Sequence, residues 1–558
     1  MNDFLQLQEK VILIADAASP IGGAALRMLA GQGAKAVPCS AEDFSSKERI
    51  EALFSRICGD PALGRIDGLF YNLLPAPARI GIRDLTEKDF DAAIDGYITS
   101  CFLTAQLLGE QIRRQEEAVG HIRAFDGGSL VFLNSIHSEK PNGAAPLFSM
   151  CMGAVKNLVR EITLFYGQWG LRATLIEPGA TGGEDELFYA GTSSLYNGYQ
   201  YKIPDGHVGT PDDIAGIACF LLSSASRYVS GESIRADGGL TLHYIDHAAN
   251  VREYMKRGME RERGIAGPED QKAPSGPFTM PYFDHEKQTR PDHVPGTIDP
   301  MFLRGKTVLV TGSGKGIGSD IALTAAQHGA NVVVHYNSSE ENARRVYAEI
   351  DRTAPASILV RADLSERGGA QKLYDAAVQA FGGVDVLVNN AALQYNLELG
   401  EYDAEHLQKI FRVNLRGYAM MSRLVLPHMR EKGWGRIVCM SSVHGKRPTL
   451  FDPGYCMTKG GIKMLVRELA IDAAEDDITV NALEPGAVEI GVKSGNPQPT
   501  VRHLEMREPP LFQYAGRLVH GRMANPWDIS STVMYLLSDE AFRINGVAIR
   551  IDDAGMLR

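Results

Sequence analysis

Short apolar runs that end in turns of small residues recur along both halves of the chain. The first half begins with "KVILIADAASPIGG" from Lys10, and the second half has "KTVLVTGSGKGIG" from Lys306. Later apolar runs open on an aspartate, "DGLFYN" at Asp67 and "DVLVNN" at Asp385. These strand-like runs alternate with helical stretches, which predicts βαβ units and a parallel sheet in each half.

The two halves repeat the same segments in the same order, so the chain is an internal duplication. "GSLVFLNSIHSEKPNGAAPLFSMCMGAVKNLVRE" is matched by "GRIVCMSSVHGKRPTLFDPGYCMTKGGIKMLVRE", and "TLIEPGA" is matched by "TVNALEPGA". We therefore predict two tandem, doubly wound α/β domains, at residues 1–245 and 301–558. Residues 246–300 are rich in proline and polar residues, which indicates a linker.

Composition narrows the class of protein. A chain of 558 residues is too long for one core, and 44% hydrophobic with 22% charged residues is ordinary for a soluble protein. The net charge of −11 argues against nucleic acid or an anionic membrane as a partner. The N-terminus has no signal pattern and no apolar run reaches the roughly 18 residues of a membrane span, so we expect a cytoplasmic protein. Reduced structural thiols, without zinc or disulfides, are expected from seven scattered cysteines that form no CxxC pair: Cys39, Cys58, Cys101, Cys151, Cys219, Cys439 and Cys456.

A glycine-rich turn in the second half predicts a dinucleotide site. "VLVTGSGKGIG" places Gly312, Gly316 and Gly318 between a strand and a helix. Glycine lets the backbone turn tightly and approach a phosphate, and the helix N-terminus favours the negative charge of a pyrophosphate.

The motifs that follow this turn resemble those of the short-chain dehydrogenase/reductase (SDR) family. "NNAA" at 389–392, Asn414, Ser442, the pair Tyr455 and Lys459, and "PGA" at Pro485 follow in that order. The resemblance covers 301–558 and extends to 1–245 as a degraded relative. It implies Rossmann-type domains and an NAD(P)(H)-dependent oxidoreductase that interconverts a secondary alcohol and a ketone.

The resemblance also implies which residues contact the cofactor. At the end of the second strand, a carboxylate would select the free ribose 2′-hydroxyl, but this sequence has Tyr336 there. A neutral, donor-rich site with one cation nearby favours NADP(H), and NAD(H) stays possible if Lys315 is only a surface residue. The full set of expected contacts is Gly312, Ser313, Lys315, Gly316, Ile317, Gly318, Tyr336, Asn337, Ser338, Asp363, Leu364, Asn390, Ala391, Tyr455, Lys459, Pro485, Gly486 and Val488.

Two residues four apart carry the expected chemistry. Tyr455 and Lys459 share one helix face. A nearby ammonium lowers the pKa of a tyrosine, which is otherwise about 10. By resemblance, Tyr455 is the general acid/base, and Lys459 lowers its pKa and holds the nicotinamide ribose. Ser442 would hydrogen-bond the substrate oxygen, and Asn414 would support a water-linked proton path.

The first copy departs from this pattern at each position. Ser135 is retained, but Phe148 and Met152 replace Tyr455 and Lys459, so a proton and a charge are lost. The glycine turn is also altered: Asp16 and Pro20 stand for Gly312 and Gly316, and Asn414 is aligned with Asp95. An aspartate there repels a pyrophosphate and proline lacks an N–H. We expect a non-catalytic copy that acts as an internal dimer partner, within a homo-oligomer resembling an SDR tetramer.

The first copy is also shorter in one place. The interval from Gly22 to Asp67 is 45 residues, whereas the interval from Gly318 to Asp385 is 67. We predict that one strand and one helix are missing, on the side of the sheet where the adenosine of a dinucleotide would lie.

The substrate remains open at the level of the sequence. The stretch 488–520 is expected to cover the substrate, and polyols, sugars, ketoacyl thioesters and cyclic ketones are all compatible. An SDR-type epimerase or dehydratase, and a scaffold that binds nicotinamide cofactors, are the alternatives. Candidate substrate contacts are Gln394, His444, Lys493, Arg502, His503, Arg507 and Arg517.

Overall fold

A computed structural model gives the fold of both copies. It describes residues 5–75, 80–119, 127–141, 145–181, 209–227, 229–237, 240–242, 299–447, 452–473, 476–489, 523–541 and 544–552. The expected linker, except for residues 299 and 300, and the expected substrate cover beyond residue 489 lie outside these ranges.

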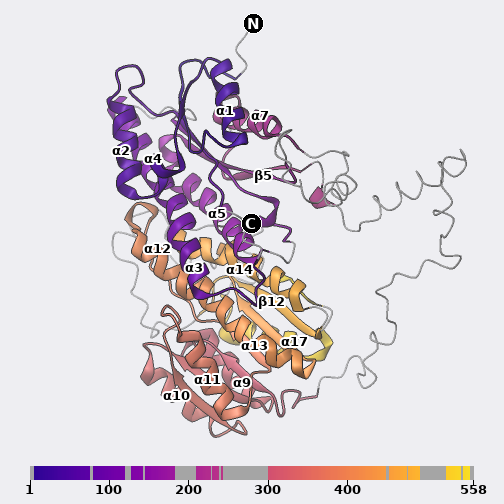
Figure 1. Cartoon of the computed structure of the whole chain (residues 1–558). Coiled ribbons are helices and arrows are strands. Elements are labelled where there is room, and N and C mark those ends of the chain that lie inside the picture. Colours follow the sequence, from indigo (N-terminus) through magenta and orange to yellow (C-terminus); the bar gives the residue numbers. More distant parts are fainter. Residues whose placement is uncertain are drawn as a thin grey trace, which may run out of the picture.

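The first copy is a six-stranded sheet in which all pairs are parallel, with the strand order β2-β1-β3-β4-β5-β6. Helices cover both faces (Figure 1), since α1 and α7 pack in one apolar cluster and α2, α4 and α5 in another. The strands are β1 (Val11–Ile14), β2 (Lys35–Pro38), β3 (Gly68–Tyr71), β4 (Gly128–Leu133), β5 (Leu171–Pro178) and β6 (Glu232–Ala236). The helices are α1 (Pro20–Gly31), α2 (Lys47–Gly59), α3 (Glu87–Ala93), α4 (Thr99–Val119), α5 (Pro146–Tyr166) and α7 (Pro211–Leu222).

The second copy is a seven-stranded parallel sheet with the order β13-β12-β11-β10-β7-β8-β9. Both sheets confirm the predicted doubly wound α/β class. The strands are β7 (Thr307–Val310), β8 (Asn331–Tyr336), β9 (Ser357–Arg361), β10 (Val386–Asn389), β11 (Gly435–Met440), β12 (Ile478–Pro485) and β13 (Ala548–Ile551). The helices are α9 (Gly316–Gln327), α10 (Glu340–Ile350), α11 (Gly369–Phe381), α12 (Ala404–Phe411), α13 (Gly417–Lys432), α14 (Pro453–Ala473) and α17 (Pro526–Leu537).

The shorter interval in the first copy has the predicted structural consequence. Within the described residues, β2 forms the edge of the first sheet, whereas β9 continues the second sheet beyond β8. No described helix of the first copy takes the place of α10, because β2 is followed by a short 3₁₀ turn and then by α2. The prediction of one missing strand and one missing helix is confirmed.

The closing helix of each copy begins in the same way. Thr210 caps α7 and Asn525 caps α17, each with an aspartate three residues later that completes a capping box and a proline at the first helical position. Side-chain oxygens satisfy amides that the first turn of a helix leaves free, and proline has no amide to satisfy there. These local signals explain why "TPDD" and "NPWD" start equivalent helices.

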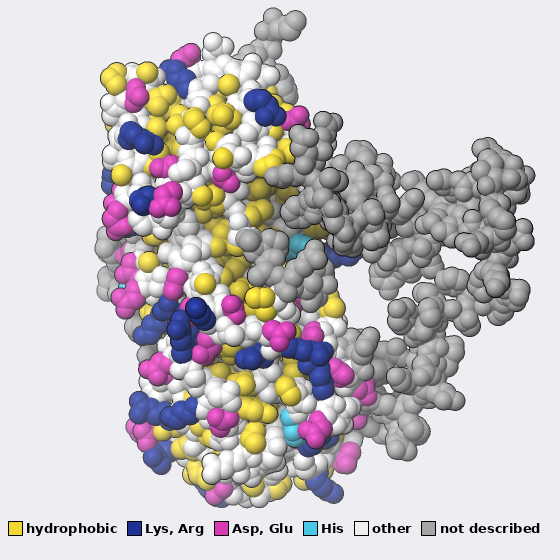
Figure 2. Space-filling view, viewed as in Figure 1, with side chains coloured by type: hydrophobic (Ala, Val, Ile, Leu, Met, Phe, Trp, Pro, Cys, Tyr) yellow, Lys and Arg dark blue, Asp and Glu magenta, His cyan; other side chains and the backbone are white. Residues whose placement is uncertain are grey.

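The two copies share one core. Helices α5 and α14 lie against each other at the centre of the molecule (Figure 1), and buried residues of both copies form a single apolar cluster. On the face shown in Figure 2, acidic and basic side chains are intermixed over both copies. Buried apolar helices therefore form the centre of the contact between the copies, and ion pairs such as that of Asp91 with Arg416 also join them.

The crossing of α5 and α14 depends on two glycines. A Cβ on Gly153 would lie 2.9 Å from Met464 Cγ and 3.0 Å from the Gly460 oxygen, and a Cβ on Gly460 would lie 2.7 Å from the Gly153 oxygen. Distances this short leave no room for a side chain. Glycine at both positions therefore sets how closely the copies approach.

We expect Gly153→Ala to destabilise the folded chain by about 1–3 kcal/mol, because the added methyl group forces α5 and α14 apart. Gly216→Ala is a matched control in α7, since no atom lies within 4 Å of the Cβ position. There alanine should stabilise by about 0.5–1 kcal/mol through its lower chain entropy. Urea unfolding of both variants measures the difference, and equal effects would contradict the tight crossing.

Candidate active site

The glycine turn lies at the carboxyl end of β7, where a parallel sheet binds ligands. Gly312 and Gly316 have φ values of +66° and +57°, which favour glycine. A Cβ on Gly318 would lie 2.4 Å from Asn390 Nδ2 and 2.6 Å from the Gly312 oxygen. All three predicted glycines are therefore required by the backbone itself.

A buried histidine that the sequence reasoning missed holds this turn. His335 Nδ1 accepts a hydrogen bond from the Gly312 amide at 2.9 Å, and Nε2 contacts the Ala362 oxygen at 3.1 Å. Burial lowers the pKa of His335 to about 4, so the ring is neutral and Nε2–H is the donor to Ala362. His335 thereby ties the glycine turn to the end of β9. Its position just before Tyr336 at a strand end was the available signal.

Thr311 and Asn390 fix the next strand end against the turn. Thr311 Oγ1 accepts hydrogen bonds from the amides of Asn390 at 2.8 Å and Ala391 at 3.0 Å. Asn390 Nδ2 donates to the oxygens of Thr311 at 3.0 Å and Gly312 at 3.2 Å. The structure thus brings together the predicted glycine turn and the predicted "NNAA" motif.

The ends of β8 and β9 form the far part of the site. Asn337 and Ser338 are exposed, whereas Tyr336 is only 8% exposed. Burial would raise the pKa of Asp363, but hydrogen bonds from Ser365 and Asn337 outweigh it and leave the pKa below its usual value.

Arg361 was missed by the sequence reasoning. It lies opposite Tyr336 in the register of β8 and β9, and its Nε donates to the Asn337 oxygen at 3.2 Å. The end of β8 therefore has a nearby cation, in addition to the predicted Lys315 of the glycine turn.

The remaining expected contacts divide into structural and accessible groups. Ser313 is fully buried and bonds to the Val310 oxygen and to His335, and Leu364 is buried near Gly417. Lys315 is exposed and is the N-cap residue of α9, whereas Ile317 packs against the core. Pro485 ends β12, Gly486 donates its amide to the Ile551 oxygen, and Val488 pairs with Ala524.

These residues fit a pyrophosphate. No side chain caps α9, so the amides of its first turn remain available to a ligand, and the glycines let the turn pack tightly at the helix start. In the first copy, Ser19 Oγ accepts from the Gly22 amide at 3.1 Å and Pro20 has no amide. The helix start that would bind a phosphate is therefore self-capped in the first copy and open in the second.

Tyr455 and Ser442 meet at the start of α14. Tyr455 is partly buried, and burial raises the pKa of its hydroxyl, while a hydrogen bond from Ser442 acts in the opposite direction. Ser442 is 6% exposed and begins the turn after β11. The predicted pair of tyrosine and serine is therefore assembled, with Tyr455 protonated at neutral pH.

Lys459 is 1% exposed and lies one helical turn from Tyr455. Its Nζ is 5.1 Å from the centre of the Tyr455 ring and donates to the Met440 oxygen at 2.6 Å. The sequence predicted that Lys459 lowers the pKa of Tyr455. In this structure, however, the lowering contribution comes from Ser442, and Lys459 points to the end of β11.

Burial lowers the pKa of Lys459 from 10.5 to about 7, because the charged form loses hydration. Between about pH 7 and 10.5 the unfolded chain binds a proton that the folded chain has released, so this contribution to stability rises with pH. We expect the stability deficit of the wild type relative to Lys459→Met to be largest below pH 7 and to shrink towards pH 10. Urea unfolding across this range measures it, and a constant difference would contradict the shift.

Asn414 lies in a π-helix, Arg412–Arg416, a rare feature that often marks functional sites. Its Oδ1 accepts from the Leu393 amide at 2.7 Å, and its Nδ2 donates to the Leu393 oxygen at 2.9 Å and to Thr458 Oγ1 at 3.2 Å. Asn414 therefore joins the loop after β10 to α14, close to Tyr455.

The first copy has a π-helix of equal length, Ile94–Ile98. Its third residue is Gly96, so Gly96 and not Asp95 corresponds to Asn414. The alignment with Asp95 was wrong by one residue, because spacing alone did not fix the register of this helix. Asp95 is exposed instead and pairs with Arg412 at 2.9 Å.

Asp452, also missed by the sequence reasoning, holds the start of the tyrosine helix. This buried carboxylate accepts from the amides of Tyr455 at 2.9 Å, Tyr395 at 2.8 Å and Asn396 at 3.3 Å, and from the Tyr402 hydroxyl. Burial raises its pKa despite these bonds. An aspartate just before a helix is a common cap, so its four partners could not be predicted from the sequence.

The expected substrate contacts are only partly described. His444 is partly buried and its Nδ1 contacts the Arg447 oxygen at 3.1 Å, and Gln394 is exposed. The five basic residues beyond residue 490 lie outside the described residues, so their role stays a prediction.

The first copy has an apolar cavity where the second has its predicted catalytic residues. The cavity measures about 540 Å³, and Gly96 and Phe148, the counterparts of Asn414 and Tyr455, line it. Met152 is fully buried. The tyrosine and lysine positions of this copy thus hold apolar side chains.

The parallel sheets, the glycine turn and the strand-end contacts define an α/β protein of the dinucleotide-binding class. The model of the short chain dehydrogenase family matches residues 306–498, and a model described as enoyl-(acyl carrier protein) reductase matches residues 5–241. 3beta-hydroxysteroid dehydrogenase 1 of Eggerthella lenta is 34% identical over 45% of this chain and 93% of its own. The chain therefore belongs to the short-chain dehydrogenase/reductase family of oxidoreductases, as a tandem fusion of two copies.

Other relatives differ in the substrates that their names give. Glucose 1-dehydrogenase 2 of Bacillus subtilis is 31% identical over 45% of this chain and 94% of its own. A probable tetrahydroxynaphthalene reductase of Zymoseptoria tritici is 34% identical over 47% of this chain and 98% of its own. The solved structure of acetoin dehydrogenase YohF from Salmonella typhimurium is 27% identical, with a TM-score of 0.40 over 45% of this chain and 96% of that one.

No helix among the described residues is both long and apolar enough to cross a membrane. Among the same residues, no group of three or more histidine, cysteine or acidic side chains is placed to hold a metal ion.

Proposed function

We propose that the second copy interconverts a secondary alcohol and a ketone with NAD(P)(H), and that the first copy is its non-catalytic partner within one chain. The observation that carries this proposal is the group at the start of α14. Ser442 lowers the pKa of the Tyr455 hydroxyl, the Nζ of buried Lys459 lies 5.1 Å from the centre of the Tyr455 ring, and the same copy has a glycine turn that fits a pyrophosphate.

The residues of this group divide the work of proton transfer. The cofactor, when bound, supplies or accepts the hydride. In the direction of reduction, Tyr455 gives its proton to the substrate oxygen, and Ser442 donates a hydrogen bond to the same oxygen and orients it. Lys459, whose Nζ lies 5.1 Å from the centre of the tyrosine ring, would hold the nicotinamide ribose. Asn414 keeps the loop after β10 and α14 in register around these groups.

NADP(H) is the favoured cofactor form. The residues after β8 are neutral, and both Lys315 and Arg361 are exposed nearby. A 2′-phosphate is attracted by such cations, whereas a carboxylate, which would repel it, is missing at Tyr336. Titration of the enzyme with each cofactor tests this choice: Arg361→Gln should weaken NADP(H) binding more than NAD(H) binding.

The first copy supports the catalytic loop of the second directly. Asn157 is 1% exposed, and its Nδ2 donates to the Cys456 oxygen at 2.7 Å and to the His444 oxygen at 3.3 Å. Arg160 donates to the Lys446 oxygen at 2.8 Å. These bonds reach the residues next to Tyr455 and Ser442, which is what an internal dimer partner would contribute.

We expect Asn157→Met to lower kcat by about tenfold while the chain stays folded, because the change places the residue of the other copy, Met464, at this position. Methionine fills the space but cannot donate to Cys456 or His444. Phe148→Tyr is the control in the same copy, since it restores a hydroxyl far from these bonds. Initial rates with unchanged cofactor affinity measure the effect, and full activity of Asn157→Met would contradict the supporting role.

A panel of alcohols and ketones, read at the nicotinamide absorbance with each cofactor, tests the main proposal. Net oxidation or reduction supports it. Isomer formation or loss of water without a change in nicotinamide absorbance would instead identify an epimerase or dehydratase.

The proposal also covers the cellular location and the oligomeric state of the enzyme. All seven cysteines are free, and six of them are buried, which suits a reducing cytoplasm. We propose that two chains associate into a dimer that resembles an SDR tetramer, and sedimentation of the intact chain measures this.

A further inference from the structure

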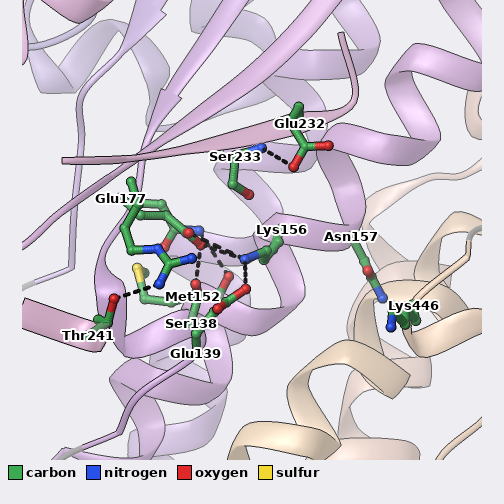
Figure 3. A network of polar contacts seen from close by, with 12 residues as sticks. Ser138, Glu139, Met152, Lys156, Asn157, Glu177, Glu232, Ser233, Thr241 and Lys446 are labelled. Atoms are coloured by element: carbon green, nitrogen blue, oxygen red, sulfur yellow. Dashed lines mark hydrogen bonds and ion pairs between the residues drawn. The ribbon is translucent and has the colours of Figure 1, made fainter. Parts of the chain in front are cut away.

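A cluster of lysine and arginine side chains lies between the two copies, outside the active site. A cavity of about 220 Å³ opens where α5 faces α14. Figure 3 shows its first-copy side, where Lys156 lies between the carboxylates of Glu139 and Glu177 and Asn157 points towards the second copy. The residues that line the cavity are Ser138, Glu139, Gly153, Lys156, Asn157, Arg160, Gly445, Lys446, Gly460, Lys463, Met464 and Arg467.

Equivalent residues of the two copies line the cavity. Lys156 and Arg160 of α5 and Lys463 and Arg467 of α14 are each 307 residues apart, the offset of the two copies in this segment. Arg160 donates to the Lys446 oxygen, and Arg467 donates to the Glu139 oxygen of the opposite copy. The same arrangement therefore occurs twice around one space, so that positive groups from both copies converge on it.

The carboxylates do not balance these cations. Glu177 pairs with Lys156 at 3.0 Å, Glu484 pairs with Lys463 at 2.8 Å, and Glu139 also contacts Lys156. In the described part of the chain, no carboxylate lies within 4.0 Å of Arg160, Lys446 or Arg467. Glu232, the next acidic residue near Arg160, acts only at longer range.

Burial makes this excess of positive charge costly. The pKa values of Arg160, Lys463 and Arg467 are all lowered, in each case mainly because burial removes hydration from the charged form. An anion in the cavity would offset that cost through charge-assisted hydrogen bonds.

We propose that this cavity binds one small anion with two or more negative charges, an inorganic phosphate or a small polycarboxylate. At roughly 30 Å³ per water the cavity has room for about seven waters, which suits such an anion but not a nucleotide. Gly445 and Gly460 line it and neighbour the Ser442 turn and Lys459, so a bound anion would tie the catalytic segment to the first copy. The site does not depend on the second copy being catalytic.

Calorimetric titration of the intact chain tests the site, with phosphate in one arm and citrate in the other, at constant ionic strength in chloride. We expect one saturable site per chain for at least one of them. Arg467→Gln should weaken it about tenfold or more, since each charge-assisted hydrogen bond lost is worth about that factor. Lys446→Gln, which changes an exposed side chain at the mouth, should weaken it in the same direction without affecting folding.

Arg345→Gln is the matched control, because Arg345 is exposed on α10, where it pairs with Glu341 and donates a hydrogen bond to Asn342. The proposal is overturned if phosphate and citrate bind no more tightly than chloride does. It is also overturned if their binding is unchanged in both Arg467→Gln and Lys446→Gln. Saturating NADP(H) should leave the anion bound, and displacement by the cofactor would mean that the anion occupies the glycine turn instead. Because binding is read without substrate, these outcomes are independent of whether the chain reduces ketones.

Discussion

Replacing Tyr455 with phenylalanine should lower kcat/KM by roughly 10²–10⁴, because the change removes the only proton that this position can exchange with the substrate oxygen. The ring itself remains, so the packing at the start of α14 is kept, and so is the hydrogen bond that the Tyr455 backbone amide donates to Asp452. Cofactor affinity should therefore change little. Initial rates and a fluorescence titration of the cofactor separate the two effects.

The matched control for this variant comes from the duplication. Phe148→Tyr restores the hydroxyl at the equivalent position of the first copy, where Met152 takes the place of Lys459. It should leave the rate of the intact chain unchanged and should not rescue Tyr455→Phe. Turnover retained in Tyr455→Phe would remove the role given to the tyrosine, and rescue by Phe148→Tyr would show that the first copy is catalytic.

Replacing Asp91 with alanine should destabilise the folded chain by about 3–5 kcal/mol, the largest stability effect that we expect. Asp91 lies in the first copy, is 7% exposed, and contacts Arg367 at 2.8 Å, Arg412 at 3.4 Å and the buried Arg416. Its loss leaves Arg416, which is 1% exposed, as a buried charge without a carboxylate. Urea unfolding of the intact chain measures the change.

Asp95→Asn is the control for Asp91→Ala, because Asp95 pairs with Arg412 at the surface of the same contact. An exposed pair contributes about 0–1 kcal/mol, so this variant should be nearly neutral. Similar losses in both variants would contradict the importance of burial. Arg416 also donates to the Ser365 oxygen, beside Asp363, so Asp91→Ala should weaken cofactor binding as well.

Low pH should remove the stabilisation that the Asp91 carboxylate provides. Burial would raise the pKa of Asp91, but Arg367 and Arg416 outweigh it and hold the pKa below its usual value. A carboxylate with a lowered folded-state pKa stabilises fully above its unfolded pKa of about 3.9 and loses that contribution as the pH falls further. The difference in stability between the wild type and Asp91→Ala should therefore be constant near neutral pH and shrink below about pH 4.

Local signals made much of the fold and site readable from the sequence. The glycine turn is required by backbone conformation at Gly312, Gly316 and Gly318, so its residue types follow from local sterics. Tyr455 and Lys459 share a helix face because helical spacing places them there. The missing strand and helix of the first copy followed from the lengths of two intervals, which need no coordinates.

Side-chain partners distant in the sequence were not readable in this way. His335 accepts a hydrogen bond from Gly312 across a strand pair. Asp452 accepts hydrogen bonds from the amides of a loop more than 50 residues earlier. The register of the π-helix placed Gly96 opposite Asn414, where spacing had suggested Asp95. Each of these depends on how elements pack, and residue types alone do not specify it.

The sequence by itself determined that this chain holds two copies of one α/β domain and that only the second has a tyrosine and lysine at the start of the long helix. Those facts follow from residue identity and spacing alone, because both determine local backbone structure directly. Only the tertiary structure decided that Asn157 and Arg160 of the first copy reach the predicted catalytic segment of the second, that Asp91 pairs with Arg416, and that cations from both copies surround one cavity. These contacts join residues about 280 to 330 positions apart, and those of Asn157 and Arg160 depend on the close crossing of α5 and α14 at two glycines.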